Sequence, residues 1–237
     1  MNLFYSEDIN EKNKEIFLRD QEHTHLIKSL RFDINEKVFI TDGNGNKYET
    51  KLIVKERNKS KLKIINKFID SEKKSKLSIA ISPTKKSNRF EWFLEKATEM
   101  GICSIYPVVC HHSEKKSLNI NRAKKILISS MKQSLQTYLP EINEPTYFNT
   151  FINNSAKNLL NLIATNKTDC NPKPYSDFAG TGNTLIMIGP EGGFSNEELI
   201  IAKNAKFTAV SLGDNRLRTE TAGVACAMLH NLTKKIK

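Results

Sequence analysis

Two short apolar runs that each end in a glycine constrain the fold of this chain more than any other feature. Residues 184–188 form an unbroken apolar run, typical of a strand buried on both faces, and are followed by Gly189-Pro190-Glu191-Gly192-Gly193. A second run at residues 207–212 ends at Gly213. Ligands of open α/β sheets bind at the carboxyl ends of strands, so both loops are expected to face one pocket.

Helices are predicted after each loop. Ser195, with Glu198 three residues later, has the pattern of a capping box and predicts a helix reaching about residue 206. The polar stretch at residues 214–221 leads into a helix of small and apolar residues at 222–232. Strand and helix patterns alternate from residue 77 to residue 231, which predicts a parallel α/β sheet.

The glycine loops exclude two common ligand classes. The stretch 189–193 lacks the Lys-Ser/Thr ending of a P-loop and the spacing of a dinucleotide fold, and no acidic residue ends a following strand. A pocket of backbone groups and apolar contacts favours a nucleoside-like, cationic ligand instead. For one glycine-rich turn a purely structural role is the better explanation, but two such loops followed by Arg216 and the run 218–221 favour a site. A further hypothesis, an enzyme that acts on a phosphate ligand, is supported only by the glycine-rich stretch 189–193.

The first 70 residues indicate a separate, β-rich domain. Two apolar runs flank the turn at residues 42–46, which is a hairpin signal, and alternating lysines in the next strands indicate one solvated face. These strands are expected to close into a small antiparallel barrel. The charged stretch 69–76 is the predicted boundary, giving domains at 1–72 and 73–237. Residues 22–30, 90–100 and 119–138 are expected to be helical, with Ser87 or Asn88 capping the second.

Bulk properties indicate a reduced protein, and its basic charge is compatible with a polyanionic partner. The net charge is +11, which fits nucleic-acid binding or simple lysine-rich solubility about equally. The four cysteines have no CxxC pair, and Cys110-His111-His112 lacks a fourth ligand at a usual spacing, so no metal is predicted. Without a signal-peptide core or an apolar run of ~20 residues, a cytoplasmic, non-membrane protein is expected.

The C-terminal motifs carry a family resemblance. IGPEGGFSNEEL followed by LGDNRLRTETA closely resembles the signature of the ribosomal RNA small subunit methyltransferase E family, in the SPOUT class. The resemblance implies a C-terminal trefoil knot that binds S-adenosylmethionine (SAM), a homodimer, and methylation of N3 of a uridine in 16S rRNA. The stretch HLIKSLRF followed by a DG hairpin resembles the N-terminal PUA-like RNA-binding domain of the same family. The family usually has an Arg where this chain has Gln136.

The resemblance also assigns roles to individual residues. The expected catalytic residues are Arg218, to stabilise the uracil anion, and Glu220, as proton acceptor, although Glu220 is equally explained as an acidic residue at a helix N-terminus. Glu191 is expected to hold loop amides. Cofactor contacts are expected from Thr165, Ile188, Gly189, Gly192, Gly193, Leu212, Gly213, Asn215, Arg216 and Leu217. RNA contacts are expected from Lys28, Arg31, Lys85, Lys86 and Arg89.

A non-catalytic function stays open beside this one. A basic N-terminal barrel would suffice for an RNA-binding protein whose α/β domain serves as a dimerisation module. The apolar face formed by Ala222, Ala225, Cys226 and Leu229 on the last helix is the predicted dimer contact, or else intramolecular core. Titration with SAM separates the enzyme from the binding protein.

Overall fold

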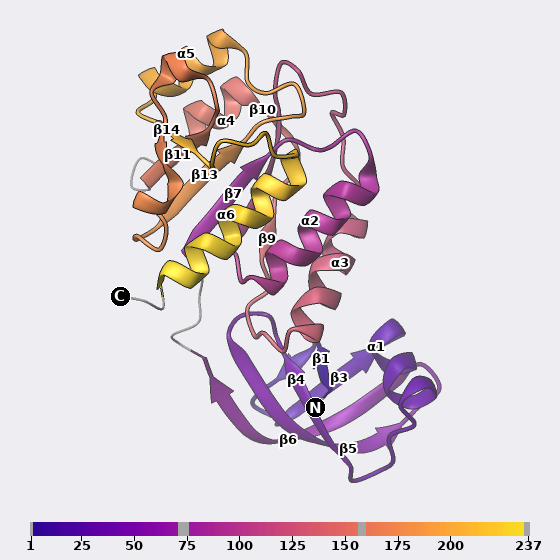
Figure 1. Ribbon diagram of the computed structural model, residues 1–237. Coiled ribbons are helices and arrows are strands. Elements are labelled where there is room, and N and C mark those ends of the chain that lie inside the picture. The colour runs from indigo at the N-terminus through magenta and orange to yellow at the C-terminus, as the bar shows by residue number, and fades with distance from the viewer. Residues whose placement is uncertain (1, 71–75, 156–159, 235–237) are drawn as a thin grey trace. The chain divides into compact units, whose positions relative to one another are not determined.

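A computed structural model describes residues 2–70, 76–155 and 160–234 and divides the chain into two compact units (Figure 1). Residues 2–70 and 128–139 form the first unit, and residues 76–127, 140–155 and 160–234 form the second. The predicted boundary between residues 72 and 73 lies outside the described residues. The inclusion of residues 128–139 in the first unit was not anticipated from the sequence.

The first unit is a curled six-stranded sheet in the order β1-β4-β5-β6-β3-β2. Its buried side chains alternate with exposed ones, and the inward set, including Ile16, Val38, Leu52 and Leu62, forms one apolar core. The predicted antiparallel sheet is confirmed, but it is a half-barrel with an open hydrogen-bonded path, and the β1–β4 pair is parallel. The strands are β1 (Leu3–Tyr5), β2 (Ile9–Asn10), β3 (Glu15–Arg19), β4 (Lys37–Thr41), β5 (Asn46–Lys55) and β6 (Lys59–Ile69).

The predicted helix at residues 22–30 is a composite. It begins as α1 (Asp20–Thr24) and continues as a π-helical turn, η1 (His25–Ser29). Leu26 is completely buried in the core of the sheet, so the apolar side of this segment faces inward.

Residues 128–139, which belong to the first unit, comprise the end of α3 (Ile120–Gln133) and the loop that follows it. The helix was predicted to reach residue 138, but Leu135 adopts a left-handed backbone conformation (φ 55°) that ends it earlier. The loop then pairs with the β4–β5 turn, since Gly45 N donates to Thr137 O at 2.9 Å. The ammonium of Lys132 also forms an ion pair with Glu22.

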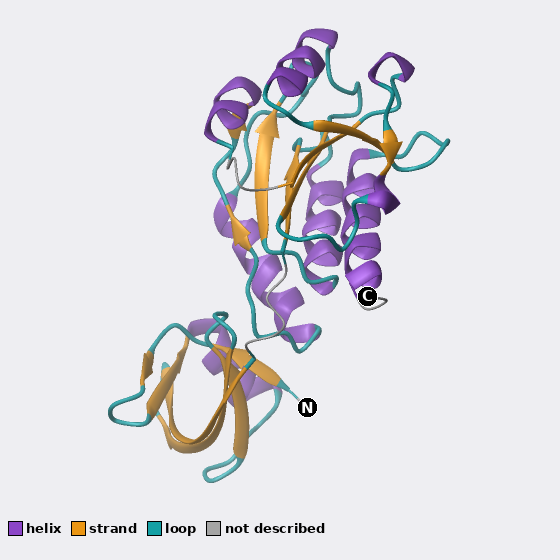
Figure 2. Cartoon of the chain, turned by 90° about the vertical axis from the view of Figure 1, so that its left-hand side faces the viewer, coloured by secondary structure: helices purple, strands orange, loops and turns teal. Residues whose placement is uncertain are grey.

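The second unit is built on a parallel sheet with helices on both faces (Figures 1 and 2). The strand order is β10-β8-β7-β13-β11-β14-β12, with β9 beside β8, and every described pair is parallel, as predicted. The strands are β7 (Leu77–Ile81), β8 (Ser104–Val109), β9 (Glu141–Ile142), β10 (Thr146–Tyr147), β11 (Leu160–Ala164), β12 (Lys173–Pro174), β13 (Thr184–Ile188) and β14 (Thr208–Ser211).

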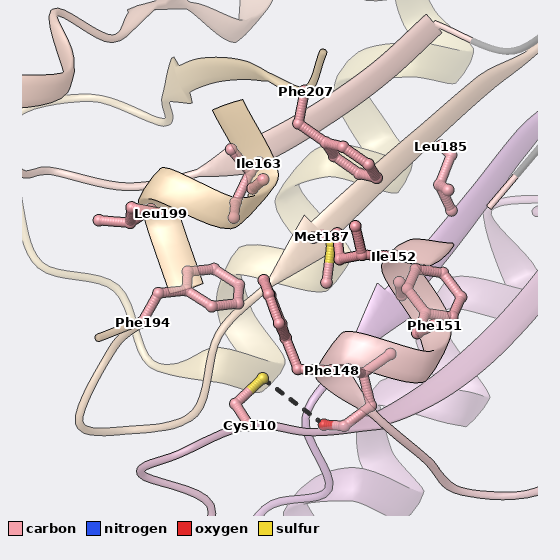
Figure 3. Packing of buried hydrophobic residues seen from close by; sticks show 13 residues of the cluster. Cys110, Phe148, Phe151, Ile152, Ile163, Leu185, Met187, Phe194, Leu199 and Phe207 are labelled. Atoms are coloured by element: carbon pink, nitrogen blue, oxygen red, sulfur yellow. Dashed lines mark hydrogen bonds between the residues drawn. The ribbon is translucent and has the colours of Figure 1, made fainter. Parts of the chain in front are cut away.

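Helices cover both faces of this sheet. Against one face lie α2 (Ser87–Glu99) and α6 (Thr219–Lys234), which pack on each other so closely that a Cβ on Gly223 would meet the Phe93 ring at 2.6 Å. On the other face, α4 (Phe148–Asn154) and α5 (Asn196–Asn204) contribute Phe148, Phe151 and Leu199 to an apolar cluster with the strands (Figure 3). Two short 3-10 turns, η2 (Thr168–Cys170) and η3 (Tyr175–Asp177), lie between β11 and β13.

Two predictions about helix starts had different outcomes. The capping box at α5 is confirmed: Ser195 Oγ accepts from Glu198 N at 3.1 Å, and Glu198 Oε2 accepts from Ser195 N at 2.8 Å. The predicted cap of α2 is wrong, because the helix already includes Ser87 and its N-cap is Lys86, which makes no side-chain cap bond. Polar residues identify the region of a helix start more reliably than the capping residue itself.

Candidate active site

A cavity of about 490 Å³ lies where β11, β13 and β14 end. These three strands are neighbours in the sheet, so the loops after them meet at one edge. All residues predicted from the sequence to contact the cofactor line this cavity except Gly213, which lies between the lining residues Leu212 and Asp214. The remaining lining residues are Ala164, Asn166, Lys167, Pro190, Glu191, Phe194, Thr219 and Ala222.

The loop after β13 is seated tightly and requires its glycines. Gly193 has a φ of +72° and donates its N–H to Pro190 O at 2.8 Å, closing a turn that other residues adopt only with strain. A Cβ on Gly192 would lie 2.9 Å from His112 Cβ, so only glycine fits there. No described atom lies within 4 Å of the Cβ position of Gly193, which leaves this part of the cavity wall open to a ligand.

Two hydrogen bonds join the loops after β13 and β14. Arg216 Nη2 donates to Glu191 O at 2.6 Å, and Thr219 Oγ1 donates to Gly189 O at 3.0 Å. The first turn of α6 is therefore fixed directly to the first glycine loop. These bonds form one continuous wall from segments about 25 residues apart.

Lys167 supplies a third connection that the sequence did not predict. Its ammonium donates to Phe194 O at 2.9 Å and to Asn196 Oδ1 at 2.6 Å, joining the β11 loop to the start of α5. Phe194 in turn packs against Phe148, with ring centroids 6.0 Å apart (Figure 3). The role of Lys167 depends on β11 lying next to β13, and the order of strands in a sheet is not evident from local patterns.

The two predicted catalytic residues lie at the start of α6 and differ in environment. Arg218 is exposed, and its guanidinium forms no hydrogen bond or ion pair in the described part of the chain. Glu220 is 6% exposed. Its Oε1 lies 3.6 Å from Arg89 Nε, while its buried Oε2 has no hydrogen-bond partner among the described residues. Both residues alternate with Leu217 and Thr219 of the cavity wall.

Two of the three predicted RNA contacts in the second unit lie beside residues of the candidate site. Lys85 forms an ion pair with Glu114 at 2.7 Å, and its backbone N–H donates to Glu191 Oε1 at 3.3 Å, so Glu191 holds a loop amide as expected. Lys86 is exposed, whereas Arg89 contacts Glu220. Arg89 thus belongs to the surroundings of the candidate catalytic carboxylate as well as to the basic loop.

The residues of the Cys-His-His stretch support the glycine loop. His112 Nδ1 is 3.0 Å from Gly193 O, and His111 N donates to Glu198 Oε1 at 2.8 Å. Burial raises the pKa of the Cys110 thiol well above its usual range.

Within the described ranges no three His, Cys, Asp or Glu side chains are placed to hold a metal ion. Across those same ranges, no helix has the length and apolar character needed to span a membrane.

Comparison with known families agrees with both units. Residues 70–231 match the model of an RNA methyltransferase domain, and residues 18–65 match that of an RNA methyltransferase PUA domain. A PUA domain followed by a parallel α/β domain with a cavity at its strand ends therefore defines the class as a two-domain RNA-modifying enzyme. The chain belongs to the RNA methyltransferase family.

Particular relatives narrow this class. Ribosomal RNA small subunit methyltransferase E of Mesomycoplasma hyopneumoniae is 29% identical over 97% of both chains, and that of Rickettsia conorii is 26% identical over 90% of this chain and 88% of its own. A probable rRNA-methyltransferase from Porphyromonas gingivalis has a TM-score of 0.90, 34% identity and full coverage of both chains. The Neisseria gonorrhoeae ribosomal RNA small subunit methyltransferase E, bound to S-adenosyl methionine, has a TM-score of 0.87 and 26% identity over 98% of both chains. The family resemblance predicted from the C-terminal motifs is confirmed.

Proposed function

We propose that this protein transfers a methyl group from SAM to N3 of a uridine in 16S rRNA of the small ribosomal subunit. The observation that carries the proposal is the cavity between the two glycine loops, whose walls are joined by Arg216 and Thr219. Support comes from relatives named for action on small-subunit rRNA and from the SAM-bound Neisseria structure.

The cavity residues fit SAM. A volume of about 490 Å³ lies within the range of small-molecule sites. Ile188, Leu212 and Leu217 offer apolar contacts to an adenosine moiety, and the glycine loops offer backbone groups at close approach. The open Cβ position of Gly193 is a cradle that a side chain would fill. When bound, SAM supplies a methyl group that is already activated by its sulfonium.

Arg218 and Glu220 are the residues we assign to the base. Uracil N3 loses a proton as it attacks, and negative charge develops on the neighbouring carbonyl oxygens. The free guanidinium of Arg218 stays charged and offers a planar set of donors to such an oxygen. Glu220 Oε2 has no hydrogen-bond partner among the described residues, and we assign it the role of proton acceptor, while Arg89 Nε lies 3.6 Å from the other oxygen.

The remaining features of the proposal concern the whole protein. Lys28, Arg31, Lys85 and Lys86 contact the RNA, the chain is a cytoplasmic SPOUT enzyme with a trefoil knot, and two copies form a dimer. The dimer proposal rests on Met228, Leu229 and Leu232 of α6, which are 40–49% exposed. The predicted contact face is corrected by the structure: Ala222 and Cys226 are buried within the chain, and of the predicted set only Leu229 is exposed.

One experiment tests the proposed function. The protein is incubated with labelled SAM and small subunits that lack the modification, and the methylated nucleoside is mapped. Label in 3-methyluridine of 16S rRNA is the expected result. Stoichiometric RNA binding without SAM binding or label would instead favour the non-catalytic RNA-binding protein.

A further inference from the structure

Three lysines lie in one row across the outer face of the N-terminal sheet. Lys37 on β4 is directly opposite Lys51 on β5, and Lys51 is directly opposite Lys63 on β6. All three side chains are exposed, while Val38, Leu52 and Leu62 beside them point into the core. Neighbouring strands are about 4.8 Å apart, so this lysine row presents three ammonium groups over a short distance.

Two carboxylates lie beside the lysine row, and each forms its ion pair with a single lysine. Together with the bond from Lys37, the charge of Lys51 helps to lower the pKa of Glu49. Lys37 pairs with Glu49 at 2.7 Å. Glu15 lies opposite Lys63 in the register, but its carboxylate is engaged by Lys61 at 2.7 Å. Neither Lys51 nor Lys63 forms an ion pair or hydrogen bond with a described side chain.

More cations extend the same face beyond Lys63. The Phe17 ring, which lies opposite Lys61 in the register, has Arg19, Lys59 and Lys61 within 5.7–5.9 Å of its centroid. Each of these three has its own acidic partner, namely Asp8, Glu56 or Glu15. The face therefore combines a basic cluster that has its own acidic partners with two adjacent lysines, Lys51 and Lys63, whose neighbouring carboxylates, Glu49 and Glu15, are paired with other lysines.

Adjacent like charges on directly opposed strand positions destabilise a sheet. Four lysines, Lys37, Lys51, Lys61 and Lys63, share the two carboxylates of Glu15 and Glu49, so this part of the face keeps a positive charge that a row of phosphates can neutralise. We infer that the lysine row binds the sugar–phosphate backbone of the RNA substrate, at a surface separate from η1 and the Lys28 and Arg31 contacts expected there. This inference rests on the proposed function, because the polyanion is taken to be the RNA that is methylated.

The test compares two double variants of the full-length protein. K51Q/K63Q removes the two unpartnered lysines, and K173Q/K203Q removes two exposed lysines without ion pairs from the second unit. Binding to unmodified small subunits is measured over a range of KCl concentrations, together with SAM affinity, melting temperature and single-turnover transfer at saturating subunits.

For K51Q/K63Q we expect affinity for subunits to fall roughly fivefold or more at low salt, with the slope of log K against log salt reduced by about 2. SAM affinity and saturated transfer should stay at wild-type values, and the melting temperature should be equal or higher because a like-charge contact is relieved. The control variant should keep the wild-type slope.

Two results would overturn the inference, and they are distinguishable. An unchanged affinity and salt slope in K51Q/K63Q, with wild-type protein binding and methylating subunits, removes the lysine row from RNA binding and leaves the proposed function intact. Failure of the wild-type protein to bind and methylate subunits removes the proposed function and this inference with it.

Discussion

At the scale of single residues, the glycines and leucines of the cavity wall are local features of the chain, whereas the side chains around the wall come from distant segments. The Glu220–Arg89 contact and the bonds of Lys167 join residues far apart in the chain, and they depend on how helices and strands are placed beside one another.

Arg218→Ala should lower single-turnover methyl transfer to small subunits by ~10²–10³, the usual loss for one donor to a developing anion. SAM affinity and melting temperature should change little, because the exposed guanidinium bonds to no described residue. Rates and SAM affinity are measured on one preparation. A rate within about threefold of wild type would exclude Arg218 from this role, since it falls far short of that loss.

At the scale of elements, strands were predicted closely and helix ends less well. The buried apolar run at β13 was placed correctly because five consecutive buried residues leave little ambiguity. The helix predicted at 119–138 ends at Gln133, since the left-handed Leu135 and the pairing of the next residues with the β4–β5 turn override the local pattern. Long-range hydrogen bonds thus decide where an amphipathic pattern stops being helical.

The loop after β13 provides a prediction with a matched control. Gly193→Val should abolish SAM binding, because it strains a backbone at φ +72° and places a side chain in the cavity wall. Gly182→Val imposes a similar strain at φ +44°, also with no described atom within 4 Å of its Cβ, but does not line the cavity. Both variants should melt at lower temperature, and only the first should lose binding by titration calorimetry. Retained affinity in a folded Gly193→Val protein would place the cofactor elsewhere.

At the scale of the whole molecule, the two-unit architecture was predicted, whereas the contribution of residues 128–139 to the first unit was not. Composition marks a boundary only where the chain passes from one unit to the next at a charged stretch. The chain returns to the first unit within the amphipathic helix α3, and composition does not identify that point. Apolar residues at helical spacing have the same pattern whichever hydrophobic core they enter.

The proposed dimer is tested at this scale. Leu229→Glu puts a charge on the exposed apolar surface of α6 and should convert a dimer to the 27.0 kDa monomer in light scattering at micromolar concentration. Ile200→Glu, at a 59% exposed apolar position on α5, is the control and should keep the wild-type mass. A monomeric wild-type protein would contradict the dimer.

A truncated protein ending at residue 74 should be less stable than the same unit in the full chain. It lacks Lys132, the partner of Glu22, and the backbone bonds from residues 137–139 to the turn at Gly43 and Gly45. Hydrogen exchange of the sheet amides compares the two proteins, and adding residues 128–139 as a peptide should restore part of the protection. Equal protection without the peptide would show that these contacts contribute nothing to stability.

The discontinuous first unit also has a consequence for how the protein is made. N-terminal domains usually fold first during synthesis, which proceeds at roughly 5–20 residues per second. Here the β4–β5 turn and Glu22 wait for partners at residues 132–139, so several seconds of translation separate the emergence of the sheet from its completion. During this interval the nascent chain carries a sheet with unfilled contacts, and its exposure to chaperones and proteases is set by the ribosome's speed as well as by the sequence.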